Sequence, residues 1–199
     1  MRAATTTSLL ALSATALAQY NNASSPFALV LSSSNSAYDG HSLAPCHEGA
    51  AIEALCVGGV YAQASAQTYT FNSTTSLLAN PPTNGGGADG ILIFSLPVQG
   101  VSEPEAFSLQ YNPASNVAVP LFEPGTESVT YVSFDASDKL NIQGAVDNGT
   151  IGSPSVPYYR WQVCKTFVGY SYTTLAWIVG SGASDNPTCE PVTVKRVFA

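Results

Sequence analysis

Carboxyl groups are the side chains of this sequence that could perform acid–base chemistry. Two carboxyl groups on either side of a glycosidic bond are the usual machinery of glycoside hydrolases. The candidates for such a pair are Asp39, Glu48, Glu53, Asp135 and Asp138. Their spacing selects no two of them, and in a chain with thirteen acidic residues most are expected to be solvated. We therefore assign no catalytic residue from the sequence.

Motifs of other chemistries are incomplete. The only histidines are His41 and His47, and His47-Glu48 lacks the second histidine of the zinc motif HExxH. The segment 169–173 lacks the closing glycine of the GxSxG elbow of serine hydrolases. The glycine run at 85–87 is not followed by the lysine of a phosphate-binding loop. The sequence predicts neither a metal site nor a cofactor.

A polar cluster and a lone basic residue are candidates for a binding pocket. His47 and Glu48 follow Cys46 and are flanked by apolar residues, while Arg160 lies in a strongly apolar segment. Arg160 could meet Glu48 or Glu53 in such a pocket. A structural ion pair of Arg160 that joins two strands is the favoured interpretation, because a buried guanidinium needs a charged partner.

Aromatic side chains are concentrated between residues 158 and 177. Trp161 and Trp177 lie in strand-like runs with apolar neighbours, so we expect both in the core. Tyr170 and Tyr172 follow Gly169 at a predicted hairpin tip, where exposed rings could stack on the faces of sugars. Both tyrosines are therefore possible binding residues.

The first eighteen residues have the pattern of an export signal. Arg2 is a positive start, residues 9–17 are short and largely apolar, and Ala16-Leu17-Ala18 is a small-x-small cleavage site. No run approaches the roughly 20 apolar residues of a transmembrane helix. We predict a signal peptide at 1–18 and a secreted protein without membrane insertion.

Four cysteines are consistent with export. Cys46, Cys56, Cys164 and Cys189 all follow the predicted cleavage site, and an even number of cysteines in an oxidising compartment favours two disulfides. Three connectivities are open. We favour Cys46–Cys56 and Cys164–Cys189, since each closes a local loop.

Three sequons are acceptors for N-linked glycans. They begin at Asn22, Asn72 and Asn148, and none has proline at its second position. A glycan is bulky and polar, so any glycosylated asparagine must lie on the surface.

The charge balance excludes some partners. Six basic residues face thirteen acidic ones, for a formal net charge of −7. Nucleic acids and anionic membranes are not expected as partners, because their phosphates are recognised by a basic face. The sequence leaves the oligomeric state open.

Short apolar or alternating runs separated by turn residues predict an all-β protein. We expect strands within the following ranges: 27–31, 69–71, 91–94, 107–111, 129–134, 139–143, 159–165, 173–179 and 191–197. These indicate a single-domain sandwich or barrel of about ten to twelve short antiparallel strands, with a β-trefoil as the alternative. The β domain should span 26–199 after a flexible N-terminal segment at 19–25.

Two segments depart from this pattern. Residues 48–56 are compatible with helical turns or with two strands, and two strands joined by the Cys46–Cys56 disulfide are favoured. The segment 80–89 is rich in proline and glycine, so we expect it to be the most flexible stretch of the domain.

The cysteine and tryptophan blocks resemble known fungal proteins. The segments 158–164, 169–177, 186–189 and 192–197, together with 26–29 and 46–53, are similar to an uncharacterised family of small secreted proteins of filamentous fungi. The last third also resembles the fungal cell-wall protein family linked to phialide and conidium development. These resemblances imply an extracellular, wall-associated β domain and transfer no catalytic residue.

Together these features predict a non-enzymatic secreted or cell-wall-associated glycoprotein with a structural or binding role. Its expected partner is a cell-wall polysaccharide. The alternatives are a carbohydrate-binding or carbohydrate-active extracellular protein, and a secreted effector.

Overall fold

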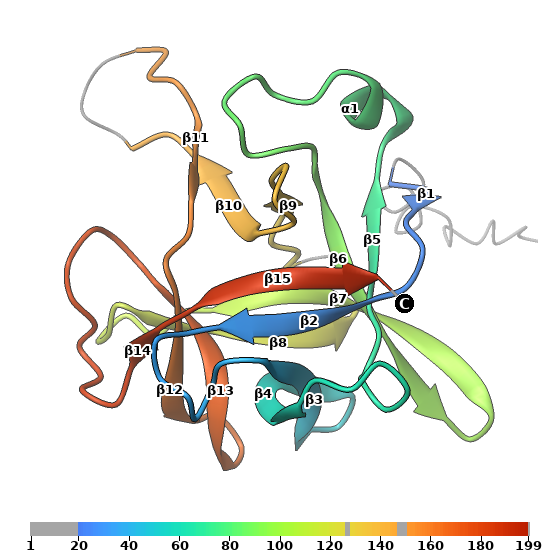
Figure 1. Ribbon diagram of the computed structural model, residues 1–199, viewed down its shortest axis with the longest axis vertical. Coiled ribbons are helices and arrows are strands. Elements are labelled where there is room, and N and C mark those ends of the chain that lie inside the picture. Colours follow the sequence, from blue (N-terminus) through green and yellow to red (C-terminus); the bar gives the residue numbers. More distant parts are fainter. Residues whose placement is uncertain (1–19, 126–127, 147–150, 199) are drawn as a thin grey trace, which may run out of the picture.

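The protein is almost entirely β-structure. The computed structural model describes residues 20–125, 128–146 and 151–198, so the predicted signal peptide at 1–18 and the sequon at Asn148 lie outside the described residues. Within these ranges the chain forms fifteen strands and one short helix (Figure 1). All pairings between the strands are antiparallel, as the sequence predicted.

The elements follow one another along the chain in a fixed order. They are β1 (Asn22–Ala23), β2 (Phe27–Ser32), β3 (His41–Gly49), β4 (Ile52–Val60), β5 (Thr70–Ser73), α1 (Thr75–Ala79), β6 (Asp89–Val98), β7 (Val101–Gln110), β8 (Val117–Pro124), β9 (Val132–Phe134), β10 (Leu140–Gly144), β11 (Val156–Tyr158), β12 (Trp161–Phe167), β13 (Ser171–Ile178), β14 (Glu190–Pro191) and β15 (Thr193–Phe198).

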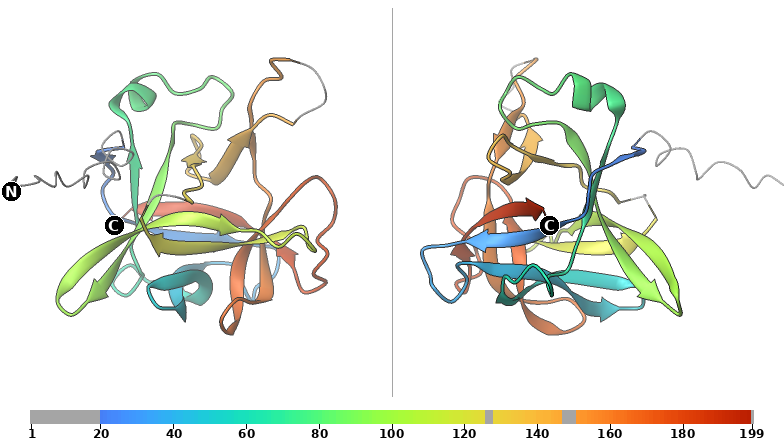
Figure 2. Two further views of the ribbon diagram at one scale, coloured as in Figure 1. Left: turned by 180° about the vertical axis from the view of Figure 1, so that it is seen from behind. Right: turned by 45° about the vertical axis from the view of Figure 1, so that its right-hand side comes forward.

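Eleven of these strands form one continuous path. Their order is β11-β10-β9-β6-β7-β8-β13-β4-β3-β2-β15, and the sheet curls so that β15 returns beside the turn before β10. There Lys139 and Lys195 form an antiparallel bridge, and the amide of Arg196 donates to the carbonyl of Asp138 at 3.0 Å. Figure 2 shows this curl from two further sides. The fold is a curled, barrel-like sheet and not the three repeated units of a β-trefoil.

Aromatic rings fill the inside of the curl. Phe27, Tyr69, Phe107, Phe122 and Trp161 are at most 2 % exposed. The polar atoms of the larger rings are satisfied, because Trp161 Nε1 donates to the carbonyl of Leu140 at 2.8 Å and the Tyr69 hydroxyl donates to that of Leu43 at 3.1 Å. Trp161 also faces Trp177 across β12 and β13, with ring centroids 4.7 Å apart. Both tryptophans are therefore core residues, as predicted.

Both disulfides have the favoured connectivity. Cys46–Cys56 joins β3 to β4, and Cys164–Cys189 joins β12 to the loop before β14. The segment 48–56 accordingly contains the end of one strand and the start of the next, with the turn at residues 50–51.

Three segments differ from the expected pattern or extend it. The helix α1 was not predicted, because its five residues are too few to show helical periodicity; Thr74 Oγ1 caps it by accepting from the amide of Leu77 at 3.1 Å. The strand β8 was also missed, since prolines interrupt its sequence at positions 120 and 124. The expected flexible segment 19–25 contains β1, which pairs with β5.

The proline- and glycine-rich segment 80–89 is held against the sheet. Gln143 on β10 accepts from Asn84 Nδ2 at 2.6 Å, and its Nε2 donates to the carbonyl of Gly87 at 2.9 Å. Gly87 has φ 88°, and a Cβ there would collide with the Phe134 carbonyl. Glycine at this position therefore allows the loop to approach β9 closely.

Replacing Gly87 with alanine is expected to lower the free energy of unfolding more than replacing Gly85. Both glycines have positive φ, 88° and 86°, and alanine in that conformation costs roughly 1–2 kcal/mol. Only at position 87 would the new methyl group meet another atom, since the site at Gly85 is open. Urea unfolding of the two variants measures the difference, and equal losses would contradict the close approach to β9.

Candidate binding site

Two hairpins that are far apart in the sequence are joined by Glu48. This residue lies near the end of β3, and its Oε2 accepts from the backbone amides of Gly169 and Tyr170 at 2.7 and 2.8 Å. The carboxylate is buried, and two N–H donors offset part of the cost of removing its charge from water. The tip of the β12–β13 hairpin is thereby held on the β3–β4 turn.

Gly169 permits this contact. A Cβ at this position would collide with the backbone carbonyl of Glu48, so a larger residue would push the two hairpins apart. Gly169 therefore does more than form the tip of the β12–β13 hairpin. It also allows the backbone of the tip to lie close to the backbone of Glu48.

The contact gathers four of the five predicted binding residues. The ring of His47 lies 6.0 Å from that of Tyr170, and the Tyr170 ring lies 6.2 Å from that of Tyr172. On its other side, His47 Nδ1 is 3.4 Å from Glu53 Oε1. Together with Glu48, these residues form one partly exposed patch at the hairpin tip.

The favoured interpretation of Arg160, a structural ion pair that joins two strands, was wrong. Its guanidinium stacks on the ring of Tyr158, 4.3 Å from the centroid, and it makes no ion pair with a carboxylate among the described residues. Arg160 precedes the buried start of β12, whereas Glu48 meets the opposite end of that hairpin. The ion pair that joins two segments belongs to Arg196, whose Nε donates to Asp138 Oδ1 at 2.7 Å.

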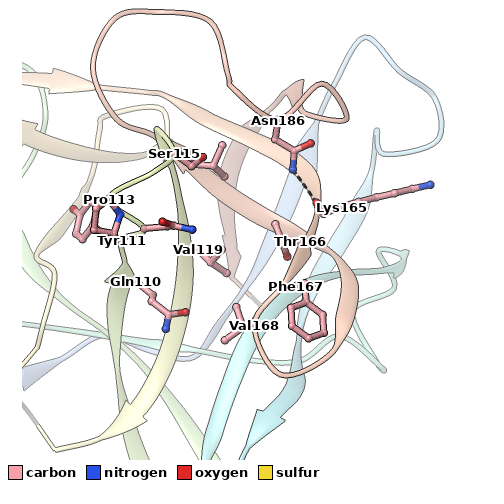
Figure 3. A pocket seen from close by; sticks show the side chains of 12 residues that line it. Gln110, Tyr111, Pro113, Ser115, Val119, Lys165, Thr166, Phe167, Val168 and Asn186 are labelled. Atoms are coloured by element: carbon pink, nitrogen blue, oxygen red, sulfur yellow. Dashed lines mark hydrogen bonds between the residues drawn. The ribbon is translucent and has the colours of Figure 1, made fainter.

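A groove of about 490 Å³ opens beside the hairpin (Figure 3). One wall is the β7–β8 turn with the adjoining strands, and the other is the end of β12 with the loop that carries Asn186. The groove is lined by Gln110, Tyr111, Asn112, Pro113, Ser115, Val117, Val119, Lys165, Thr166, Phe167, Val168 and Asn186. Its volume falls within the range of about 300–1,000 Å³ that is typical of small-molecule sites.

Two aromatic rings flank the groove. Tyr111 is 59 % exposed and Phe167 is 73 % exposed. Phe167 also borders a second hollow of about 560 Å³, which is lined in part by Tyr172 on β13. We call Tyr111, Phe167, Tyr170 and Tyr172 the aromatic face.

The groove wall at β12 is braced from behind. The Cys164–Cys189 disulfide fixes the strand to the next loop, Lys165 N donates to Thr188 Oγ1 at 3.0 Å, and Asn186 Nδ2 donates to the carbonyl of Lys165 at 2.8 Å. The groove is therefore formed in advance of any ligand.

The opposite wall is tied to the same loop. Asn116 N donates to Asp185 Oδ2 at 2.8 Å, and Asp185 N donates back to Asn116 Oδ1 at 2.9 Å. These reciprocal bonds hold the two walls at a constant separation.

The lining of the groove has little charge. Lys165 is its one charged side chain among the described residues, and no carboxyl group lines it. Amide and hydroxyl groups that can donate or accept hydrogen bonds make up most of its polar surface.

Sequence reasoning found the hairpin tip but not the groove. In the sequence, Tyr111 is only the last residue of an expected strand, and Phe167 is one aromatic residue within the stretch 158–177. Asn112-Pro113 is a turn signal in the sequence, yet nothing in it indicates that this turn faces β12. The loop containing Asn186 is brought in by the disulfide at Cys189.

A buried carboxyl group was also missed. Glu105 on β7 is 0 % exposed, and neither carboxyl oxygen has a hydrogen-bond partner. Burial raises its pKa from 4.5 to about 7, with further contributions from the negative charges of Glu53, Glu103 and Glu123. Glu105 does not line the groove.

Other kinds of site find no support in the described ranges. There, no group of three or more Cys, His, Asp and Glu side chains is arranged to hold a metal ion. In the same part of the chain, no helix is long and apolar enough to cross a membrane.

The fold and the site define an all-β, disulfide-linked protein with a preformed, aromatic-flanked groove. The chain belongs to the family described as a domain of unknown function (DUF7907), whose model matches residues 24–198. No curated protein and no solved structure matches the chain.

Glu105→Gln is expected to remove much of the pH dependence of stability. Because the folded-state pKa is about 7 and the ordinary value is 4.5, the folded protein keeps a proton that the unfolded chain has lost between these pH values. The free energy of unfolding therefore falls as the pH rises through this range. Thermal unfolding from pH 4 to 8 should show this fall in the unaltered protein and in the exposed control Glu103→Gln. An unchanged slope in Glu105→Gln would contradict the assignment.

Proposed function

We propose that this protein is a secreted, cell-wall-associated glycoprotein that binds a neutral wall polysaccharide and does not cleave it. The observation that carries the proposal is the braced groove between the exposed rings of Tyr111 and Phe167. A protein that only filled space in the wall would have no need of such a preformed hollow.

The groove offers what a sugar chain requires. Pyranose rings have apolar C–H faces that pack on aromatic rings, and their hydroxyl groups exchange hydrogen bonds with amides and hydroxyls. Rings are present at Tyr111 and Phe167, and amides at Gln110, Asn112 and Asn186. The hollow beyond Phe167 would let a chain continue towards Tyr172.

The charges favour an uncharged polymer. A net charge of −7 repels acidic polysaccharides at long range, and the single lysine in the groove offsets little of this repulsion. A neutral glucan, mannan or chitin does not meet this repulsion.

Several features support an extracellular location. Disulfides persist mainly in oxidising compartments, and this chain has two. The predicted signal peptide and the three sequons point the same way. The resemblance to fungal secreted and wall proteins adds the wall as the place of action.

The test is depletion of the purified glycosylated protein from solution by insoluble chitin, β-glucan, mannan and cellulose. One of these polymers should deplete the protein selectively. Phe167→Ala and Tyr111→Ala should each weaken binding about tenfold, equivalent to ~1.4 kcal/mol for one stacked ring. Tyr131→Ala is the matched control, because this exposed tyrosine lies outside the groove.

Three outcomes would revise or contradict the proposal. Loss of binding in Tyr170→Ala and Tyr172→Ala, but not in the groove variants, would move the site to the hairpin tip. If no polymer depletes the folded protein, a protein partner such as that of a secreted effector would become the better explanation. Release of soluble sugars from any polymer would contradict the non-enzymatic role.

A further inference from the structure

Another, smaller pocket lies on the side of the molecule where β1 meets β5. Its volume is about 210 Å³, and it is lined by Asn22, Ala23, Ser24, Phe71, Leu78, Ala88, Phe134 and Arg196. Most of this lining is apolar. Leu78 is 48 % exposed, so part of the lining is left open to water.

Asn22 is directed towards the apolar rim of this pocket. It pairs with Ser73 across β1 and β5, and residues two apart on a strand share a face, so Asn22 lies on the same side as Phe71. Its Nδ2 donates to Thr75 Oγ1 at 3.3 Å. Thr75 and Leu78 are three residues apart on α1 and therefore also share a face. A group attached to Nδ2 would start beside Leu78.

Asn22 is also the first residue of a sequon, Asn22-Ala23-Ser24, and it is exposed. The second sequon is less suitable. Asn72 lies in β5 between β1 and β6, and its Oδ1 is buried without a hydrogen-bond partner. A glycan at Asn72 would have to leave a crowded strand, whereas one at Asn22 leaves an edge.

We propose that Asn22 carries an N-linked glycan and that its first N-acetylglucosamine packs over this pocket against Leu78. The inference rests on the proposed export, because the modification occurs in the secretory pathway. Nδ2 forms a bond to the anomeric carbon of a lipid-pyrophosphate-linked oligosaccharide, the bond from that carbon to the pyrophosphate breaks, and Nδ2 loses one proton. It keeps the other, so the hydrogen bond to Thr75 can persist.

The sugar would act as a clamp on β1. This strand has only two residues, and beyond it Ser24 exchanges bonds with Phe71 through its amide and its hydroxyl, at 2.9 and 3.0 Å. The acetamido methyl group and the C–H face of the sugar would cover the exposed side chain of Leu78, which stabilises the folded state by removing apolar surface from water.

Occupancy is tested by mass spectrometry of glycopeptides from protein secreted by a eukaryotic host. Two forms are compared, one with the native first eighteen residues and one with a foreign export signal in their place. We expect Asn22 to be modified in the secreted protein and Asn22→Gln to lose that glycan. Failure of only the native form to be secreted would contradict the predicted signal, whereas secreted protein with unmodified Asn22 would overturn the present inference.

Packing is tested with an endoglycosidase that leaves one N-acetylglucosamine on the asparagine. The one-sugar protein should melt roughly 2–4 °C above Asn22→Gln, the shift that corresponds to about 1 kcal/mol in a domain of this size. In a Leu78→Ser background the difference should disappear, while in Val101→Ser, an exposed valine on the distant β6–β7 hairpin, it should remain. An equal sugar effect in Leu78→Ser would show that the sugar does not pack there.

Discussion

The aromatic filling of the curled sheet determines which side of every strand faces outward. Side chains alternate along a strand, so a ring that must point inward sets the direction of all its neighbours. On β12, Trp161 and Val163 point into the core and are almost fully buried. The strand continues beyond the core, and Phe167, on the same side of the strand, is therefore exposed at the groove. A residue that lines the groove is thus positioned by the packing of residues four and six positions earlier.

Glu48 links the end of β3 to the tip of the β12–β13 hairpin. A buried carboxylate is costly unless donors surround it, and the two amides at the β12–β13 tip are such donors. The contact spans more than a hundred residues of sequence and needs a glycine at position 169. Glu105 is the opposite case, because no donor reaches it and burial raises its pKa to about 7. The same sheet therefore holds one buried carboxyl group with two backbone donors on Oε2 and one with no hydrogen-bond partner at all.

The sequence was sufficient for the fold class, most strands and both disulfides, because these follow from alternation, turn residues and short loops. His47, Glu48, Tyr170 and Tyr172, which the sequence named as possible binding residues, lie together in the structure, and their role in binding stays a prediction. The sequence failed for Arg160, Glu105 and the groove. Each of these depends on which strands lie side by side: Arg160 sits at the wrong end of β12 to reach Glu48, and Tyr111 reaches β12 only through the curl of the sheet. The sequence pattern within one strand does not show which other strands lie beside it.

The disulfide and hydrogen bonds that hold the groove walls affect the affinity for a ligand as well as the shape of the groove. A ligand that must order a loop loses part of its binding free energy to that ordering. Here the disulfide at Cys164, the reciprocal bonds of Asn116 with Asp185, and the bond from Asn186 to β12 have fixed both walls already. A neutral polysaccharide forms few strong contacts per sugar, so its binding depends on keeping such losses small and on repeating weak contacts along the chain. If the proposed polysaccharide binds here, the two hollows that Phe167 borders would meet the second condition by contacting successive sugars of one polymer.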